Sequence, residues 1–156
     1  MLRTKNIEKR TYIRDGRAPI PKKEITSEIM SRIRGKDTKP EVALRKAIWA
    51  KGLKGYRLHW KKAPGTPDIS FPGQKFAIFV HGCYWHRCPY CKLSMPKTHK
   101  KFWNDKFEKN KGRDKRKIRA LRKEGWQTLT FWECQIKKDL NRCVERVLSN
   151  SMNRRI

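Results

Sequence analysis

Residues 64–83, PGTPDISFPGQKFAIFVHGC, are the stretch from which the fold can be inferred. The five residues 76–80 are all apolar, which is typical of a short strand buried on both faces. Pro72-Gly73 marks a turn immediately before them. We therefore expect a β-hairpin that has Asp68 at the start of its first strand and delivers His81-Gly82-Cys83 to the end of its second.

A helix is predicted upstream of this hairpin. Thr38 suits the N-cap, Pro40 suits the first turn, and Glu41 stands where a capping box has its glutamate. Apolar residues follow at helical spacing, and Gly52 then favours a stop.

The remaining elements are predicted from apolar spacing. Residues 56–60 suit a short strand, and residues 98–124 suit a helix in two pieces separated by a polar stretch. Residues 126–132 are expected to form a central strand, and residues 136–149 a closing helix. This order predicts an α/β fold in which helices cover the faces of a mixed sheet.

The charge of the chain indicates its class of partner. Among 156 residues there are 41 Lys plus Arg against 14 Asp plus Glu, a formal net charge of +27. Such an excess favours a polyanion, and nucleic acid is the first candidate because Lys and Arg neutralise phosphates. No apolar run approaches the roughly 20 residues that span a bilayer, and the N-terminus is polar, so we expect neither a membrane segment nor a secretory signal.

The length suits one domain. We expect residues 1–26 to be a basic, flexible N-terminal arm, residues 27–150 to be a single domain, and residues 151–156 to be a basic C-terminal tail.

The five cysteines predict a metal site. An odd count without a signal peptide argues against a disulfide framework. Cys83, Cys88 and Cys91 lie within nine residues, which suits structural zinc. We favour Cys134 as the fourth ligand because it ends an apolar run that is expected to be a strand. The alternatives are Cys143, which also suits a core position, and three histidines: His81, His86 and His99.

Asp68 is the only acid between Glu41 and Asp105. A carboxylate at a strand start could anchor the hard cation that phosphodiester cleavage needs, usually Mg²⁺. It could equally make a local turn with its own backbone. Glu41 is equally well explained as the capping-box glutamate, and it could fill both roles, since a helix N-terminus that faces the site would place its carboxylate near Asp68.

His81 and His86 flank Cys83. Either imidazole could act as a general base near neutral pH, or bind zinc, and the residues alone do not rank these roles. Asp114 could orient such a histidine, although an exposed ion pair is the commoner use of an acid among lysines and arginines.

Three apolar side chains could enter a base stack. Tyr84 and Trp85 are adjacent aromatics beside a cysteine and are hard to bury together, so one at least could stack on bases. Met30 lies in a basic segment and could be a core residue or an apolar wedge.

These segments together closely resemble the very-short-patch-repair endonucleases, the Vsr family of bacterial enzymes that nick DNA at T:G mismatches. The resemblance covers roughly residues 26–149. It is carried by four segments that occur in the family's order: MSRIRGKDTKPE at 30–41, PGTPD at 64–68, FVHGCYWH at 79–86 and WEC at 132–134.

The resemblance implies a restriction-endonuclease-like fold, one structural zinc ion and a Mg²⁺-dependent active site. Asp68 matches the aspartate that binds Mg²⁺, and Val80 matches a position that offers Mg²⁺ its backbone carbonyl. His86 matches the histidine that activates water. The other implied roles are Asp114 as the partner of that histidine, Glu41 and His81 as further active-site groups, Cys83, Cys88, Cys91 and Cys134 as zinc ligands, and Met30, Tyr84 and Trp85 as intercalating residues.

The sequence departs from the family at several points. Some members have histidine where Cys88 stands, the loop differs by about one residue, and position 84 is Tyr where Phe is usual. The arm has no counterpart that we can align. The acidic-Lys half of the usual restriction-nuclease motif is absent after Phe76, which puts more weight on His86 as the base.

The expected function is Mg²⁺-dependent nicking of one strand of double-stranded DNA, 5′ of the T in a T:G mismatch that arises from 5-methylcytosine deamination. We expect a monomer in the bacterial cytoplasm, associated with the nucleoid, with mismatch-repair proteins as candidate partners. Two other readings stay open: a restriction-type nuclease that cuts paired DNA, and a non-catalytic, zinc-stapled module that binds nucleic acid. No residue names the flanking bases, the cognate methyltransferase or the role of the arm.

Overall fold

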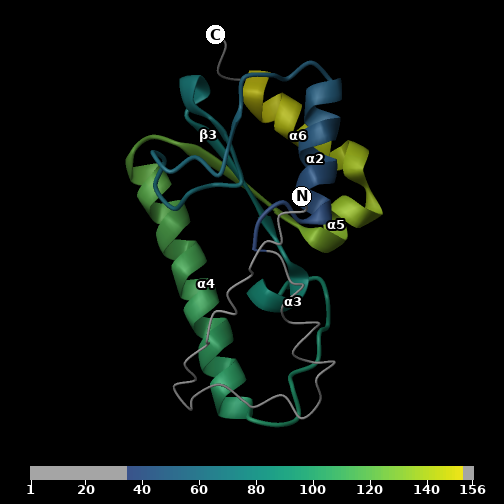
Figure 1. Cartoon of the computed structure of the whole chain (residues 1–156), viewed down its shortest axis with the longest axis vertical. Helices are drawn as coiled ribbons and strands as arrows, with labels where there is room; N and C mark the ends of the chain where they lie inside the picture. The colour runs from purple at the N-terminus through teal and green to yellow at the C-terminus, as the bar shows by residue number, and fades with distance from the viewer. Residues whose placement is uncertain (1–34, 153–156) are drawn as a thin grey trace, which may run out of the picture.

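The computed structural model describes residues 35–152, and Figure 1 shows their arrangement. The predicted arm and Met30 lie outside the described residues. The elements are α2 (Lys39–Ala50), β1 (Arg57–Leu58), β2 (Ile69–Phe71), η1 (Pro72–Gln74), β3 (Phe76–His81), α3 (Cys83–His86), α4 (Lys100–Lys123), β4 (Gln127–Trp132), α5 (Glu133–Lys138) and α6 (Leu140–Met152).

The described residues form one sheet in the order β1-β2-β3-β4. The predicted hairpin is confirmed, since β2 pairs antiparallel with β3 in a register that sets Ile69 opposite Ile78. β3 then pairs in parallel with β4, and His81 lies opposite Trp132. The sheet is therefore mixed, as predicted, and β3 and β4 end at the same edge.

Residues 76–80 of β3 are all apolar because each face of the strand packs against a different layer. One face joins the larger core, which also contains Leu44 of α2 and Val147 of α6. Ala77 and Phe79 point to the other face, where they pack with Leu121 of α4. Figure 1 shows the same division, with α4 on one side of the sheet and α2, α5 and α6 on the other. This architecture is consistent with a restriction-endonuclease-like fold.

β4 is not the central strand that its sequence predicted. It lies at one edge of the sheet formed by residues 35–152. Apart from Phe131, its residues are only partly buried. Polar Thr128 and Thr130 alternate with its apolar residues, a pattern that an edge strand with one wetter face can accept.

Helix α2 begins and ends near the predicted positions. Thr38 is the N-cap, but its hydroxyl donates to Glu41 Oε1 at 2.8 Å and accepts no backbone N–H of the helix. Glu41 Oε2 accepts the N–H of Asp37 at 2.9 Å. In a capping box it would accept the N–H of the N-cap residue, Thr38, so the observed bond lies one residue earlier. Gly52 follows the helix with a φ of +82°, a conformation that glycine adopts without strain.

Two further predictions about helices were wrong. α4 is one helix of 24 residues, because lysine and arginine are good helix formers and the polar stretch needs no break. The closing helix begins earlier than predicted and is divided at Asp139 into α5 and α6. α6 continues through Ser151, which is buried and bonded to Gln74 at 2.7 Å, so the helix enters the range expected for the tail.

Among residues 35–152 no helix is both long and apolar enough to cross a membrane.

Gly65 fixes how the turn before Asp68 packs on α4. Its φ is +74°, and a Cβ added there would lie 2.6 Å from Lys117 Cβ. We predict that Gly65→Ala lowers the free energy of unfolding by about 1–3 kcal/mol, because it adds both backbone strain and overlap.

Urea denaturation of the purified protein measures this change. Gly73→Ala is the matched control, since no atom lies within 4 Å of a Cβ added at Gly73. Equal stability of the two variants would contradict the prediction.

Candidate active site and metal centre

The candidate site lies where β3 and β4 end side by side. β3 ends at His81, and Gly82 leads directly into α3, which carries Cys83 and His86. β4 ends at Trp132 and leads into α5, which carries Cys134. Two segments about 50 residues apart in sequence thus meet because their strands pair in parallel.

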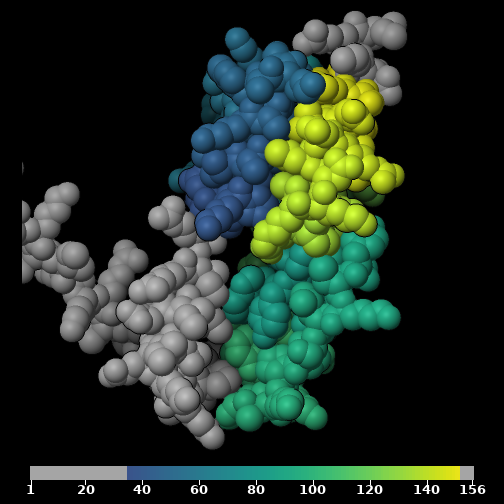
Figure 2. All heavy atoms as spheres, turned by 90° about the vertical axis from the view of Figure 1, so that its right-hand side faces the viewer, coloured from purple at the N-terminus to yellow at the C-terminus, as the bar shows by residue number. Residues whose placement is uncertain are grey.

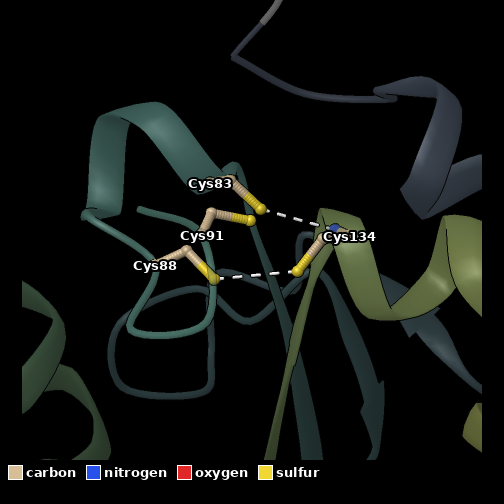
Figure 3. A group of neighbouring side chains, drawn as sticks. All are labelled: Cys83, Cys88, Cys91 and Cys134. Atoms are coloured by element: carbon tan, nitrogen blue, oxygen red, sulfur yellow. Dashed lines mark hydrogen bonds between the residues drawn. The ribbon is translucent and has the colours of Figure 1, made fainter. Parts of the chain in front are cut away.

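The four cysteines predicted to bind zinc converge in the structure. Figure 3 shows the side chains of Cys83, Cys88 and Cys91 pointing toward Cys134 at the start of α5. The sulfurs of Cys88 and Cys134 are 3.7 Å apart. Tetrahedral zinc with Zn–S bonds of about 2.3 Å separates its sulfurs by about 3.8 Å, so these thiols fit the ion.

The environment of Cys83 also fits a metal site. Burial raises the pKa of its thiol to about 11, so without a cation the thiolate is disfavoured near neutral pH. A zinc ion would supply the charge that stabilises it. Cys143 lies elsewhere, buried in the larger core with Val144 and Val147, as its alternative role as a core thiol predicted.

His86 and Asp114 are in direct contact. His86 of α3 and Asp114 of α4 face each other, with His86 Nδ1 2.5 Å from Asp114 Oδ2. Burial alone would raise the pKa of Asp114, but the hydrogen bond and charge of His86 outweigh burial and hold that pKa below its usual value. An ionised Asp114 accepts the Nδ1 proton, so Nε2 of His86 is left as the basic nitrogen.

His81 stacks on His86 with ring centres 4.2 Å apart and planes within 9° of parallel. Burial, and then the charge at His86, lower the pKa of His81 to about 4. His81 is therefore neutral at pH 7, and with His86 and Asp114 it forms a group separate from the four cysteines.

Asp68 is bonded across the sheet and not to its own turn. Its Oδ2 accepts the N–H of Val80 at 2.7 Å. Burial raises the pKa of Asp68 to about 6, and the nearby charge of Glu41 adds to the increase. A carboxylate held in this way favours a bound cation, because a cation offsets both the burial and the repulsion.

Glu41 and Asp68 are joined by a residue that the sequence did not single out, His59. One atom from each of the three lies within 4.8 Å of the others, a set that could hold a metal ion. The side chain of Glu41 is 6% exposed, that of His59 15% and that of Asp68 20%. The only sequence signal for His59 was its place in residues 56–60, which were predicted as a strand shortly before Asp68 in the chain.

A cleft of about 950 Å³ lies beside these groups, and part of the candidate site lines it. Glu41, Val80 and His86 line it, together with three basic residues, Lys39, Arg113 and Lys137. Figure 2 shows the junction at which α2 and the C-terminal helices meet the lower half of the molecule. The cleft therefore combines acidic and imidazole groups with cations that can bind phosphate.

Tyr84 and Trp85 pack edge to face, with ring centres 5.2 Å apart, and both are half-buried. Tyr84 also contacts Phe107 of α4, at 5.5 Å between ring centres. Trp85 lines the cleft, and Lys106 Nζ lies 5.2 Å from its ring centre. The structure thus places Tyr84 toward α4 and Trp85 at the cleft.

Known proteins resemble this chain over most of its length. The sequence model of the family described as DNA mismatch endonuclease Vsr matches residues 19–92. Type II nicking enzyme V.XorIIP of Xanthomonas oryzae is 42% identical over 109 residues, which are 69% of this chain and 79% of that protein. Type II nicking enzyme V.NmeAIP of Neisseria meningitidis is 36% identical over 130 residues, 83% of this chain and 90% of that protein. DNA mismatch endonuclease Vsr of Escherichia coli is 34% identical over 120 residues, 77% of this chain and 76% of that protein.

A mixed sheet that presents carboxylates and histidines beside basic residues is the framework of a nuclease. With these relatives, it establishes the chain as a DNA endonuclease, a hydrolase of phosphodiester bonds. The chain belongs to the Vsr family of DNA mismatch endonucleases, as its four sequence segments predicted.

The cysteine cluster generates a prediction about zinc content. We expect the purified protein to carry one zinc ion per chain, and Cys134→Ser to lose most of it, because three remaining thiols leave the tetrahedron open. Inductively coupled plasma mass spectrometry measures the stoichiometry.

Cys143→Ala is the control and should keep its zinc, since Cys143 lies in the core. A wild-type protein purified without zinc, or a Cys134→Ser variant that keeps it, would contradict the assignment.

The raised pKa of Asp68 predicts a dependence of stability on pH. The folded state favours the protonated carboxyl of Asp68. This contribution to stability is fully present below pH 3.8 and is lost as the pH rises through about 6. At about pH 8, and without divalent ions other than zinc, Asp68→Asn should raise the free energy of unfolding by about 1–3 kcal/mol.

The gain in the free energy of unfolding of Asp68→Asn over wild type should shrink as the pH falls toward 5. Asp105→Asn, at an exposed position on α4, should change stability little at any pH in this range. Chemical denaturation at several pH values measures both variants. A destabilised Asp68→Asn protein at pH 8 would mean that its carboxylate is compensated by groups other than a cation.

Proposed function

We propose that the protein nicks one strand of double-stranded DNA, 5′ of the thymine in a T:G mismatch left by deamination of 5-methylcytosine. The observation that carries this proposal is the contact of His86 Nδ1 with Asp114 Oδ2 at 2.5 Å. It gives a general base of defined orientation beside the cleft that Glu41 and Val80 also line. The names of the relatives, mismatch endonuclease and nicking enzyme, support the choice of DNA lesion and product.

His86 would take the proton of the attacking water. Asp114 holds the proton on Nδ1, which keeps the lone pair of Nε2 available and stabilises the imidazolium that forms. His81 stacks on His86 and is neutral, so it orients the base ring without repelling its new charge.

Asp68 and the carbonyl of Val80 would hold Mg²⁺, and Glu41 would assist nearby. Oxygen donors in a buried, acidic environment fit this ion. When bound, Mg²⁺ supplies positive charge that stabilises the developing negative charge on the scissile phosphate. Cys83, Cys88, Cys91 and Cys134 would hold zinc in a purely structural role, fixing α3, and with it His86, against the start of α5.

Recognition would use deformability of the mismatch. A T:G pair is more easily unstacked than a Watson–Crick pair, so apolar wedges enter it at lower cost. Trp85 at the cleft, with Tyr84 behind it, is suited to stack from this side. Met30, which lies outside the described residues, remains our candidate for the opposite groove. The net charge of +27 supplies the general attraction to phosphates.

We also propose that the protein acts as a monomer in the bacterial cytoplasm, at the nucleoid. Mismatch-repair proteins are the candidate partners that would take over the nicked product.

A labelled duplex tests the activity and its catalytic groups together. Wild-type protein should nick the T-containing strand of a T:G duplex in Mg²⁺, and should leave the fully paired control intact. We expect His86→Ala to lower the rate by roughly 10²–10⁴ and Asp68→Ala by at least as much, because each removes a group that acts in the transition state.

His99→Ala is the matched control, since His99 is exposed at the start of α4. Full activity in either active-site variant would remove that residue from the mechanism. Cutting of paired DNA would favour a restriction-type nuclease, and binding without metal-dependent nicking would favour a non-catalytic module.

A further inference from the structure

His59 is surrounded by carboxylates on both sides of its ring. Nδ1 lies 3.7 Å from Asp68 Oδ1. Nε2 lies 3.8 Å from Glu41 Oε2 and 3.8 Å from Asp37 Oδ1. The atom Nε2 is buried and has no hydrogen-bond partner among the residues that the structure describes.

If the imidazole is neutral, this arrangement leaves one ring nitrogen without a suitable neighbour. A neutral imidazole has one N–H and one lone pair, so one of its nitrogens must direct a lone pair at carboxylate oxygens, which carry no proton to share. The separations of 3.7–3.8 Å also exceed the usual hydrogen-bond length of about 2.7–3.2 Å. Two ligand atoms on one metal ion, each bonded at about 2.1 Å, typically lie about 3–4 Å apart. A cation between these groups therefore suits both the chemistry and the spacing.

The backbone commits His59 to this position. Its N–H donates to the carbonyl of Asp68 at 3.2 Å, directly after the pairing of β1 with β2. Its φ is +44°, in the left-handed region that residues with a Cβ seldom occupy. The main-chain hydrogen bond thus helps to hold the imidazole beside the Asp68 carboxylate.

We propose that His59 is a nitrogen ligand of the cation that Asp68 would bind, with Glu41 beside it as a further oxygen donor. This inference rests on the proposed function in one respect, because it concerns the metal that Asp68 would bind for cleavage. It goes beyond the proposed function because the metal would then have both oxygen and nitrogen ligands, and not oxygen ligands alone.

The donor set determines which ions the site prefers. Mg²⁺ favours oxygen ligands and rarely accepts an imidazole, whereas Mn²⁺ and Co²⁺ accept both kinds of donor. The protein should therefore bind Mn²⁺ more tightly than Mg²⁺ at this site, and the difference should depend on His59.

The experiment uses the zinc-loaded, full-length protein without DNA, so that phosphates do not compete for the ion. Binding of Mn²⁺ and of Mg²⁺ is measured by calorimetry for wild type, His59→Gln and His99→Gln. Pulsed electron paramagnetic resonance of the Mn²⁺ complex detects directly whether a ¹⁴N nucleus is bonded to the metal. His99→Gln is the matched control, because it removes an exposed imidazole from the same chain.

We expect ¹⁴N coupling in wild type and in His99→Gln, and its loss in His59→Gln. The Kd for Mn²⁺ should rise about tenfold or more in His59→Gln, and the Kd for Mg²⁺ should change much less, since glutamine retains an oxygen donor. Asp68→Asn should weaken binding of both ions.

Three outcomes would overturn the proposal: wild-type protein that binds no Mn²⁺, a wild-type Mn²⁺ complex without ¹⁴N coupling, or equal losses of both ions in His59→Gln. A wild-type spectrum without ¹⁴N coupling rejects the proposal even if the variant fails to fold, which circular dichroism reports, whereas assignment of an observed nitrogen to His59 requires a folded His59→Gln protein. The nicking assay is independent of these data. Absence of ¹⁴N coupling in a wild-type protein that nicks DNA would reject His59 as a ligand, and a bound nitrogen in a wild-type protein that does not nick would reject the proposed function.

Discussion

The parallel pairing of β3 with β4 is the contact on which the rest of the site depends. It sets His81 opposite Trp132, so both strands deliver their following helices to one edge of the sheet. From that edge α3 supplies Cys83 and His86, and α5 supplies Cys134. β3 can hold this position because its two faces pack into two separate hydrophobic layers. The cysteine cluster and the histidine that contacts Asp114 are consequences of one strand pair.

The whole chain and the acidic groups of its candidate site carry charges of opposite sign. A net charge of +27 attracts DNA at long range, yet Glu41, Asp68 and Asp114 lie with histidines in the candidate site, where we propose that the phosphate reacts. Burial raises the pKa of Asp68, and the charge of Glu41 adds to the increase. A bound cation would offset both effects, so the site favours one. Asp114 differs, because its contact with His86 outweighs burial and keeps its pKa low. In the mechanism that we propose, Asp68 binds a metal ion and Asp114 orients a histidine.

Much of the fold could be predicted from local patterns. The hairpin that ends at His81, the helix that starts after Thr38 and the convergence of Cys134 with the cysteine loop all follow from apolar runs, caps and ligand spacing. The errors concern relations between elements. β4 was expected at the centre of the sheet and lies at its edge, since strand order depends on contacts distant in sequence. α4 was expected in two pieces, because a polar stretch can be a break or a solvated turn of one helix.

By itself, the sequence determined the types of chemistry available: thiols spaced for zinc, rare acids in a basic chain, and histidines beside a buried strand. These features are local, and the resemblance to a family added their roles. Only the tertiary structure decided which groups meet. It joined His86 with Asp114 across 28 positions, bonded Asp68 to Val80 and not to its own turn, and brought His59 between Glu41 and Asp68. A lone histidine after a short strand carries no chemical signal of its own, because its role depends on the carboxylates that folding places around it.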